Sequence, residues 1–150
     1  MELRASALWA VVLFGCGPFL LFPGGKLDGP VKPTPSSFAF ATSGATIQLE
    51  TRPEDPYSVN VTSAIAGNGL YVSAGNSRSR WVQNIEVTPL VRARVEGDVY
   101  ELRARRVVDA AEMDAFAEAW VSRNGWARDP RKLGGETWVF RLEPRSATTH

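Results

Sequence analysis

The sequence predicts a mainly β protein with two helices, in which six antiparallel strands form a small barrel behind an N-terminal membrane helix. Six runs of residues alternate between apolar and polar side chains, as half-buried strands do. Two short turns that contain glycine, residues 67–69 and 96–98, join neighbouring runs into hairpins. Two further segments have apolar side chains at helical spacing, one after the third strand and one before the last.

The longest strand is predicted over residues 57–66. Its odd-numbered side chains form a face for the core, whereas Ser58 and Asn60 lie on the opposite, polar face. The other five strands are expected over residues 46–50, 70–74, 90–95, 99–105 and 137–142.

The first helix is predicted to be short. Ser79 is its expected N-cap, because a serine hydroxyl can accept a hydrogen bond from the first turn. Trp81 and Ile85 are four residues apart and share one face. Pro89 marks its end.

The second helix is predicted from Asp109 to about Arg123. Asp109 and Glu112 have the spacing of a capping box, in which each side chain satisfies a backbone N–H of the first turn. One apolar stripe follows the helix, made of Met113, Phe116, Ala117, Trp120 and Val121. We expect this stripe to pack in the core and assign it no cofactor role.

Residues 1–23 are predicted to be a membrane anchor or signal segment. Residues 5–22 are 18 consecutive uncharged residues, which is the lower limit for crossing a bilayer. Residues 13–16 resemble a lipoprotein cleavage box, so a lipidated Cys16 and a cleaved signal are alternatives to the favoured uncleaved anchor. We expect the following domain to be exported, to the periplasm or another extracytoplasmic compartment.

Residues 24–35 are rich in proline and glycine and are predicted to be an extended linker. The barrel domain is expected over residues 36–145, with a frayed tail at 146–150.

The overall charge and the residue inventory exclude several classes of function. The formal net charge is +1, so no global field would attract nucleic acid. Cys16 is the only cysteine and His150 the only histidine, which argues against a metal site and against a histidine-based catalytic triad.

Residues 76–80 form a polar loop between a predicted strand and the first helix. Ser77, Arg78 and Arg80 would lie at the helix N-terminus, where free N–H groups and two full positive charges can hold a phosphate or a carboxylate. The alternative is a solvated arginine loop without a ligand.

The chain resembles the split-barrel flavin-binding superfamily, which includes pyridoxamine-phosphate oxidases and deazaflavin-dependent nitroreductases. The resemblance covers roughly residues 46–142. It is carried by residues 73–75, 81–85, Pro89, Val91 and Val95, by the strand 100–108 and by the helix with an acidic cap. The Gly-rich basic motif that deazaflavin reductases have before the second strand is replaced here by residues 50–60.

The resemblance implies a homodimer that binds FMN or a deazaflavin at the subunit interface. Carried over by position, the phosphate-binding candidates are Ser73, Ser77, Arg78 and Arg80. Ser58 and Asn60 would lie nearer the ring.

Arg52 is a further candidate with two interpretations. Its guanidinium could bind a phosphate or an acidic substrate with two parallel hydrogen bonds. Alternatively it pairs with Glu54 or Asp55 within the same turn, an exposed pair that would stabilise the fold by at most about 1 kcal/mol.

Three more side chains near the loop are also open to two interpretations. Tyr57 and Trp81 could stack on a flavin ring, although packing in the core is favoured for both. Asn84 could contribute to the site or hydrogen-bond to the backbone near Pro89.

These features lead to two functional hypotheses. The first is a membrane-tethered flavin- or deazaflavin-dependent oxidoreductase acting on a small molecule, in which the cofactor carries the hydride chemistry and no catalytic residue can be named. The second is a cofactor-free split barrel that serves as a binding or structural module. Hydrolysis is disfavoured, because the acidic residues 50, 54 and 55 have no partner nucleophile.

Overall fold

The computed structural model describes residues 23–123, 129–132 and 137–145. Its elements are β1 (Val31–Lys32), β2 (Thr46–Thr51), β3 (Tyr57–Ala66), β4 (Gly69–Ala74), α1 (Arg80–Val87), β5 (Leu90–Val95), β6 (Asp98–Arg106), α2 (Ala110–Arg123), the 3-10 helix η1 (Pro130–Lys132) and β7 (Trp138–Pro144). The predicted membrane segment, apart from residue 23, and the predicted tail lie outside the described residues. Within these residues, no helix has the length and apolarity to cross a bilayer.

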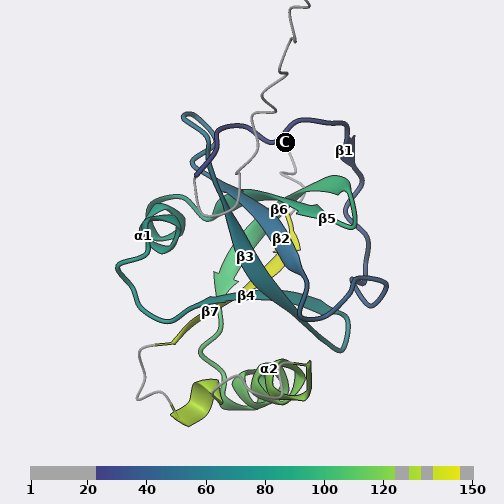
Figure 1. Cartoon of the computed structure of the whole chain (residues 1–150), viewed down its shortest axis with the longest axis vertical. Helices are drawn as coiled ribbons and strands as arrows, with labels where there is room; N and C mark the ends of the chain where they lie inside the picture. The colour runs from purple at the N-terminus through teal and green to yellow at the C-terminus, as the bar shows by residue number, and fades with distance from the viewer. Residues whose placement is uncertain (1–22, 124–128, 133–136, 146–150) are drawn as a thin grey trace, which may run out of the picture.

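Six of the strands form a closed antiparallel barrel (Figure 1). The strands follow the order β6–β5–β2–β3–β4–β7, and a further pairing between β6 and β7 closes the ring. Strand β6 is nine residues long and pairs with both β5 and β7. Leu102, for example, pairs with Val91 of β5 on one side and with Pro144 of β7 on the other. The prediction of a mainly β, six-stranded antiparallel barrel with two helices is therefore confirmed.

Both predicted hairpins are present. The β3–β4 turn has Gly67 at a φ of 56°, and the β5–β6 turn has Glu96 and Gly97 at φ values of 49° and 90°. These positive φ angles match the right-handed twist of the paired strands, and glycine adopts them without steric cost. The turns therefore connect neighbours in sequence, while the closing β6–β7 pair joins strands that α2 and η1 separate.

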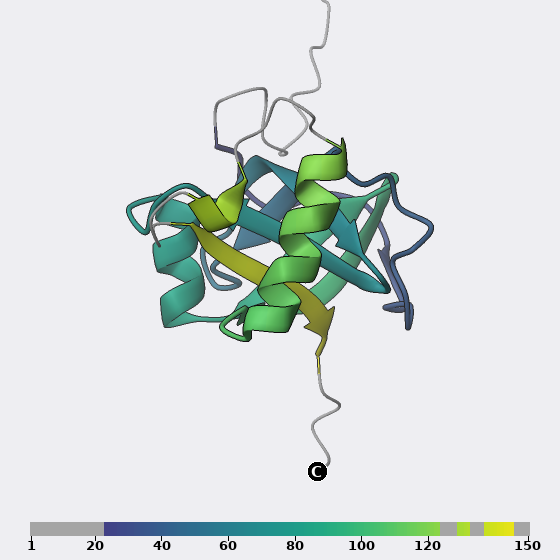
Figure 2. The same cartoon turned by 90° about the horizontal axis from the view of Figure 1, so that it is seen from below.

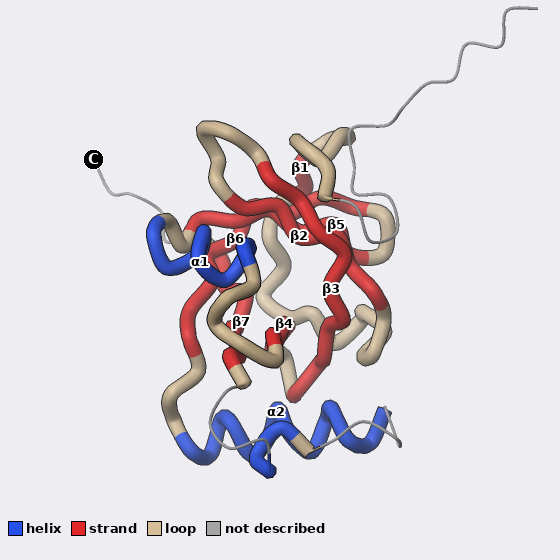
Figure 3. The backbone as a smooth tube through the Cα atoms, turned by 60° about the vertical axis from the view of Figure 1, so that its left-hand side comes forward, coloured by secondary structure: helices blue, strands red, loops and turns tan. Residues whose placement is uncertain are grey.

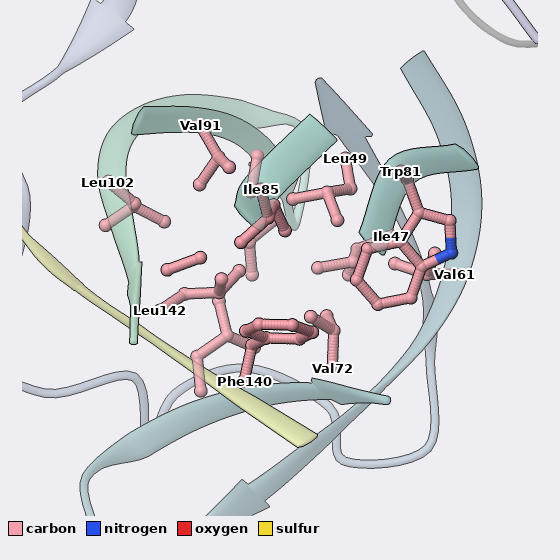
Figure 4. Close-up of a cluster of buried hydrophobic side chains, with 14 of the residues drawn as sticks. Ile47, Leu49, Val61, Val72, Trp81, Ile85, Val91, Leu102, Phe140 and Leu142 are labelled. Carbon is pink, nitrogen blue, oxygen red and sulfur yellow. The ribbon is translucent and has the colours of Figure 1, made fainter. Parts of the chain in front are cut away.

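The core lies inside the barrel (Figure 4). Strand β5 shows the simplest pattern, since Val91, Ala93 and Val95 are buried and the residues between them are partly exposed. Helix α1 contributes Trp81, Val82 and Ile85 to the same cluster. The Trp81 ring meets the edge of Phe140 at a centroid distance of 5.8 Å, so α1 is held against the barrel by its apolar face.

Helix α1 begins and ends where the sequence predicted, but its N-terminal cap differs from the prediction. Ser79 occupies the N-cap position, but its side chain makes no capping hydrogen bond, so that part of the prediction is wrong. The helix ends at Val87, where the backbone N–H of Thr88 donates to the carbonyl of Asn84. Pro89 follows and cannot continue the helix.

Helix α2 packs on the outer surface of the barrel (Figures 2 and 3). Its Phe116 and Ala117 are buried, and Phe116 packs in a cluster with Ala64 of β3, Tyr71 of β4 and Val139 of β7. The Asp109 carboxylate accepts the N–H of Glu112 at 2.8 Å, which confirms half of the capping box. The Glu112 side chain does not return to the cap. It binds Arg105 and Tyr71 instead.

The segment of residues 24–34, predicted to be an extended linker, lies on the barrel. Gly24 exchanges two backbone hydrogen bonds with Ser58, and β1 pairs in parallel with β6. Leu27 is 1 % exposed, and its N–H donates to the buried carboxylate of Glu50 at 2.5 Å. One buried leucine and a strand edge therefore hold the segment in place despite its prolines.

Candidate functional site

The structure brings together two of the predicted arginines at one aromatic ring. Arg52 lies in the turn between β2 and β3, and Arg80 is the first residue of α1. Their guanidinium carbons lie 5.9 Å and 5.4 Å from the centroid of the half-buried Tyr57 ring. Both distances are within the range of a cation–π contact. We call Arg52, Tyr57 and Arg80 the arginine–tyrosine cluster.

Asn84 ties α1 to this cluster. Its amide donates to the hydroxyl of Thr51 at 2.9 Å, and that hydroxyl donates to the carbonyl of Tyr57 at 3.1 Å. The Asn84 side chain therefore bonds across to β2 rather than to the backbone near Pro89. Because Thr51 is 1 % exposed, this chain of hydrogen bonds fixes the position of the helix relative to the β2–β3 turn.

Arg52 forms an ion pair and a hydrogen bond with Asp55 of its own turn. Its Nη2 lies 2.6 Å from the Asp55 carboxylate, and its Nε donates to the Asp55 carbonyl at 3.0 Å. The pair is exposed, since 83 % of the Asp55 side chain is accessible, so it contributes little to stability. Of the two interpretations of Arg52, the structure shows the turn arginine, with its guanidinium still beside Tyr57.

The phosphate-binding candidates of the loop of residues 76–80 are exposed. Ser77, Arg78 and Arg80 all face solvent, and the backbone N–H of Arg78 donates to the side chain of Asn76 at 2.9 Å. Within the described part of the chain, neither Arg78 nor Arg80 has an ion-pair partner. Two positive charges of the loop are therefore available to an anion.

Ser73 lies on the outer surface of the barrel, away from the core. It pairs with Val139 of β7 and is on the same face of β4 as Tyr71, which packs under α2. A role for Ser73 together with Arg80 would therefore need a ligand that also contacts the outer face of the barrel.

Ser58 and Asn60 lie on the outer face of β3, as predicted, but this face is not open at Ser58. Ser58 is completely buried because the segment around Gly24 covers it, and its hydroxyl has no hydrogen-bond partner in the described residues. Asn60 is half-buried opposite Gln48 of β2. Trp81 is 8 % exposed and packs against Phe140, so its ring belongs to the core rather than to an open binding surface.

The charged network around α2 was not predicted. Arg105 binds Glu112 at 2.8 Å and Glu143 at 2.7 Å, and the Tyr71 hydroxyl donates to Glu112. The hydrogen bond from Arg105 lowers the pKa of Glu112, whereas burial is the main cause that raises the pKa of Tyr71. Only the spacing of Arg105 and Glu112, seven residues apart across the strand–helix junction, could have indicated this network.

The geometry of the arginine–tyrosine cluster suits binding of an anion better than acid–base chemistry. It offers two guanidinium groups and one aromatic face, and the carboxylate beside it, that of Asp55, is already paired. No group of histidine, cysteine, aspartate and glutamate side chains in the described residues could hold a metal ion.

Solved structures share this fold. No protein-family model and no curated protein matches the chain. A putative pyridoxamine 5′-phosphate oxidase from Listeria innocua is 14 % identical, with a TM-score of 0.53 over 67 % of this chain and 83 % of that one. An F420 reductase is 17 % identical, with a TM-score of 0.51 over 76 % of this chain and 97 % of that one.

A protein of unknown function from Agrobacterium tumefaciens gives a TM-score of 0.56 at 19 % identity. The match covers 67 % of this chain but only 48 % of that protein, so this chain spans about half its length. At such low identities the likeness establishes the barrel fold, which the chain shares with these proteins.

Proposed function

We propose that this protein is an oxidoreductase of the split-barrel type that binds a flavin or a deazaflavin and acts on a small molecule. The fold supports the proposal, because proteins named as a pyridoxamine 5′-phosphate oxidase and an F420 reductase have the same barrel. Fold alone does not assign a function. The proposal therefore depends on the residues of the site.

The observation that carries the proposal is the convergence of Arg52 and Arg80 on the Tyr57 ring. A phosphorylated cofactor with a flat ring needs cations for its phosphate and an apolar or aromatic surface for its ring. Arg78 and Arg80 have no carboxylate partner in the described residues, and Tyr57 gives an aromatic surface beside Arg80. The residues present therefore fit such a group.

The residues of the site would have different roles. Arg78 and Arg80 would hold the phosphate, since a guanidinium pairs with two oxygens of a phosphate at once. Asn84 would act indirectly, by keeping α1 at a set distance from the β2–β3 turn through Thr51. When bound, the cofactor supplies the hydride transfer.

Specific observations favour a second candidate, a cofactor-free binding or structural module. Arg52 is engaged by Asp55 at 2.6 Å, and the predicted ring contacts Ser58 and Trp81 are both buried. Under this alternative, Arg78 and Arg80 would bind a simple anion or none.

We also propose that residues 1–23 attach the protein to a membrane, that the barrel is exported and that it forms a homodimer. The uncharged run of residues 5–22 supports the attachment. The homodimer follows from the resemblance to split-barrel flavoproteins. A nucleic-acid partner is not expected, because the net charge is only +1.

The test is cofactor retention by the complete chain. A fragment starting at residue 36 would lack Leu27 and β1, which pack on the barrel. The chain, kept in a non-ionic detergent because residues 5–22 are uncharged, is mixed with FMN or with a deazaflavin. Unbound cofactor is then removed and the visible absorption is recorded.

The matched variants are Arg78→Ala with Arg80→Ala, against the control Arg103→Ala with Arg123→Ala. The control removes two exposed arginines of β6 and α2 and so changes the net charge equally. We expect the loop variant to bind the cofactor roughly ten-fold more weakly or worse, because charge-assisted hydrogen bonds are lost. Absence of a retained band from folded wild-type protein, or equal losses in both variants, would exclude the proposed site.

A further inference from the structure

A cavity apart from the arginine–tyrosine cluster lies on the outer surface of the barrel. It has a volume of about 270 Å³ and is bordered by the segment of residues 24–34, the end of β2, the β2–β3 turn and the start of β5. None of Arg52, Tyr57 and Arg80 lines it, although Thr51 borders both places. The volume is slightly below the usual range for ligand pockets, roughly 300–1000 Å³, which indicates a small ligand.

The floor of the cavity holds a buried ion pair. Glu50 is 3 % exposed and accepts hydrogen bonds from the N–H of Leu27 at 2.5 Å and from Arg92 Nη1 at 3.1 Å. The side chain of Arg92 is 11 % exposed, and its Nε is buried without a hydrogen-bond partner in the described residues. Glu50 therefore neutralises the guanidinium but does not satisfy all of its donors.

The remaining charges leave the cavity positive. Glu101 at the rim pairs with Arg145 at 3.4 Å, and both side chains are partly exposed. Lys26 also lines the cavity and has no ion-pair partner within the described ranges. Three cations therefore face two carboxylates, which leaves one positive charge for a ligand to balance.

Part of the wall is apolar. Val31 of β1 and Leu90 of β5 line the cavity together with Pro53 and Pro56 of the β2–β3 turn. Val31 is 46 % exposed, so a ligand that covered it would remove apolar surface from water. A ligand with one charged end and a short apolar body would match both parts of the wall.

We propose that this cavity binds a small organic monoanion, a carboxylate with a short apolar body. Its carboxylate lies against Lys26 and Arg92, and its body lies against Val31 and Leu90. A monovalent anion is favoured over a divalent phosphate, because the two carboxylates of the wall repel additional negative charge. The assignment is independent of the cofactor site.

The test is calorimetric titration of the complete chain with benzoate, with its neutral analogue benzamide and with inorganic phosphate. Lys26→Ala is compared with Lys32→Ala, which removes an exposed lysine that does not line the cavity. An Arg92→Ala variant is avoided, because it would leave Glu50 buried without a partner.

We expect benzoate to bind, and benzamide and phosphate each to bind roughly ten-fold more weakly or not at all. Lys26→Ala is expected to weaken benzoate binding about three- to five-fold, with no change in Lys32→Ala. Equal binding of benzamide, tighter binding of phosphate, or equal effects of the two lysine variants would overturn the proposal. Benzoate binding should persist in the Arg78 and Arg80 double variant, which separates this result from that of the cofactor test.

Discussion

Replacing Glu50 by glutamine is expected to destabilise the barrel strongly. The substitution keeps the shape of the side chain but removes its charge, and Glu50 is 3 % exposed beneath the segment of residues 24–34. Arg92, whose side chain is 11 % exposed, would then be a buried cation without a counter-charge. Breaking a buried pair in this way costs about 3 kcal/mol of the free energy of unfolding.

Glu101→Gln is the matched control. Glu101 borders the same cavity and also pairs with an arginine, Arg145, at 3.4 Å. Its side chain is 48 % exposed, so water screens the pair and solvates the arginine that is left. We expect Glu101→Gln to change the free energy of unfolding by at most about 0.5 kcal/mol.

The assay is urea denaturation of the complete chain, followed by the fluorescence of its five tryptophans. The difference between the two variants isolates the effect of burial, because both lose one carboxylate facing one arginine. A Glu50→Gln variant within about 1 kcal/mol of Glu101→Gln would refute the reasoning from buried charge.

Two further predictions concern stability. Leu27→Ala should lower the free energy of unfolding by about 2–3 kcal/mol, because Leu27 is 1 % exposed; a change below about 0.5 kcal/mol in urea denaturation would show that residues 24–34 do not pack on the barrel. Glu112→Gln should cost roughly 1 kcal/mol at neutral pH, a value limited by the 40 % exposure of Arg105. Arg105 lowers the pKa of Glu112 in the folded state. Below about pH 4.5 the unfolded chain therefore binds more protons at Glu112 than the folded chain does. The advantage in stability of wild type over Glu112→Gln should shrink in that range. A difference that stays constant from pH 7 to about pH 3 would contradict this assignment.

The local features of the fold could be predicted from the sequence because they depend on neighbouring residues. Alternation in Leu90–Val95 places every second side chain in the core, whichever strands pair with it. The Glu96–Gly97 turn and the Asp109 cap are set by the backbone preferences and hydrogen bonds of a few adjacent residues. These features supplied the strands, the hairpins and the second helix.

The candidate site could be predicted only in part. The loop with Arg78 and Arg80 was recognisable from its charges and its place before a helix. Its approach to Tyr57 was not, because Arg52 and Arg80 meet only when α1 packs against the end of β2. Trp81 is a residue type that often stacks on flat ligand rings, but α1 directs its side chain into the core.

The sequence by itself determined which residues form the six barrel strands, where two of the chain reversals lie, and which side chains carry charge near the first helix. The tertiary structure decided the closure between β6 and β7, the burial of Ser58, and the docking of residues 24–34 through Leu27. The physical reason is that patterns along the chain record which side of a strand faces the core. Which distant segments share that core, or cover an outer face, depends on contacts that no local pattern contains.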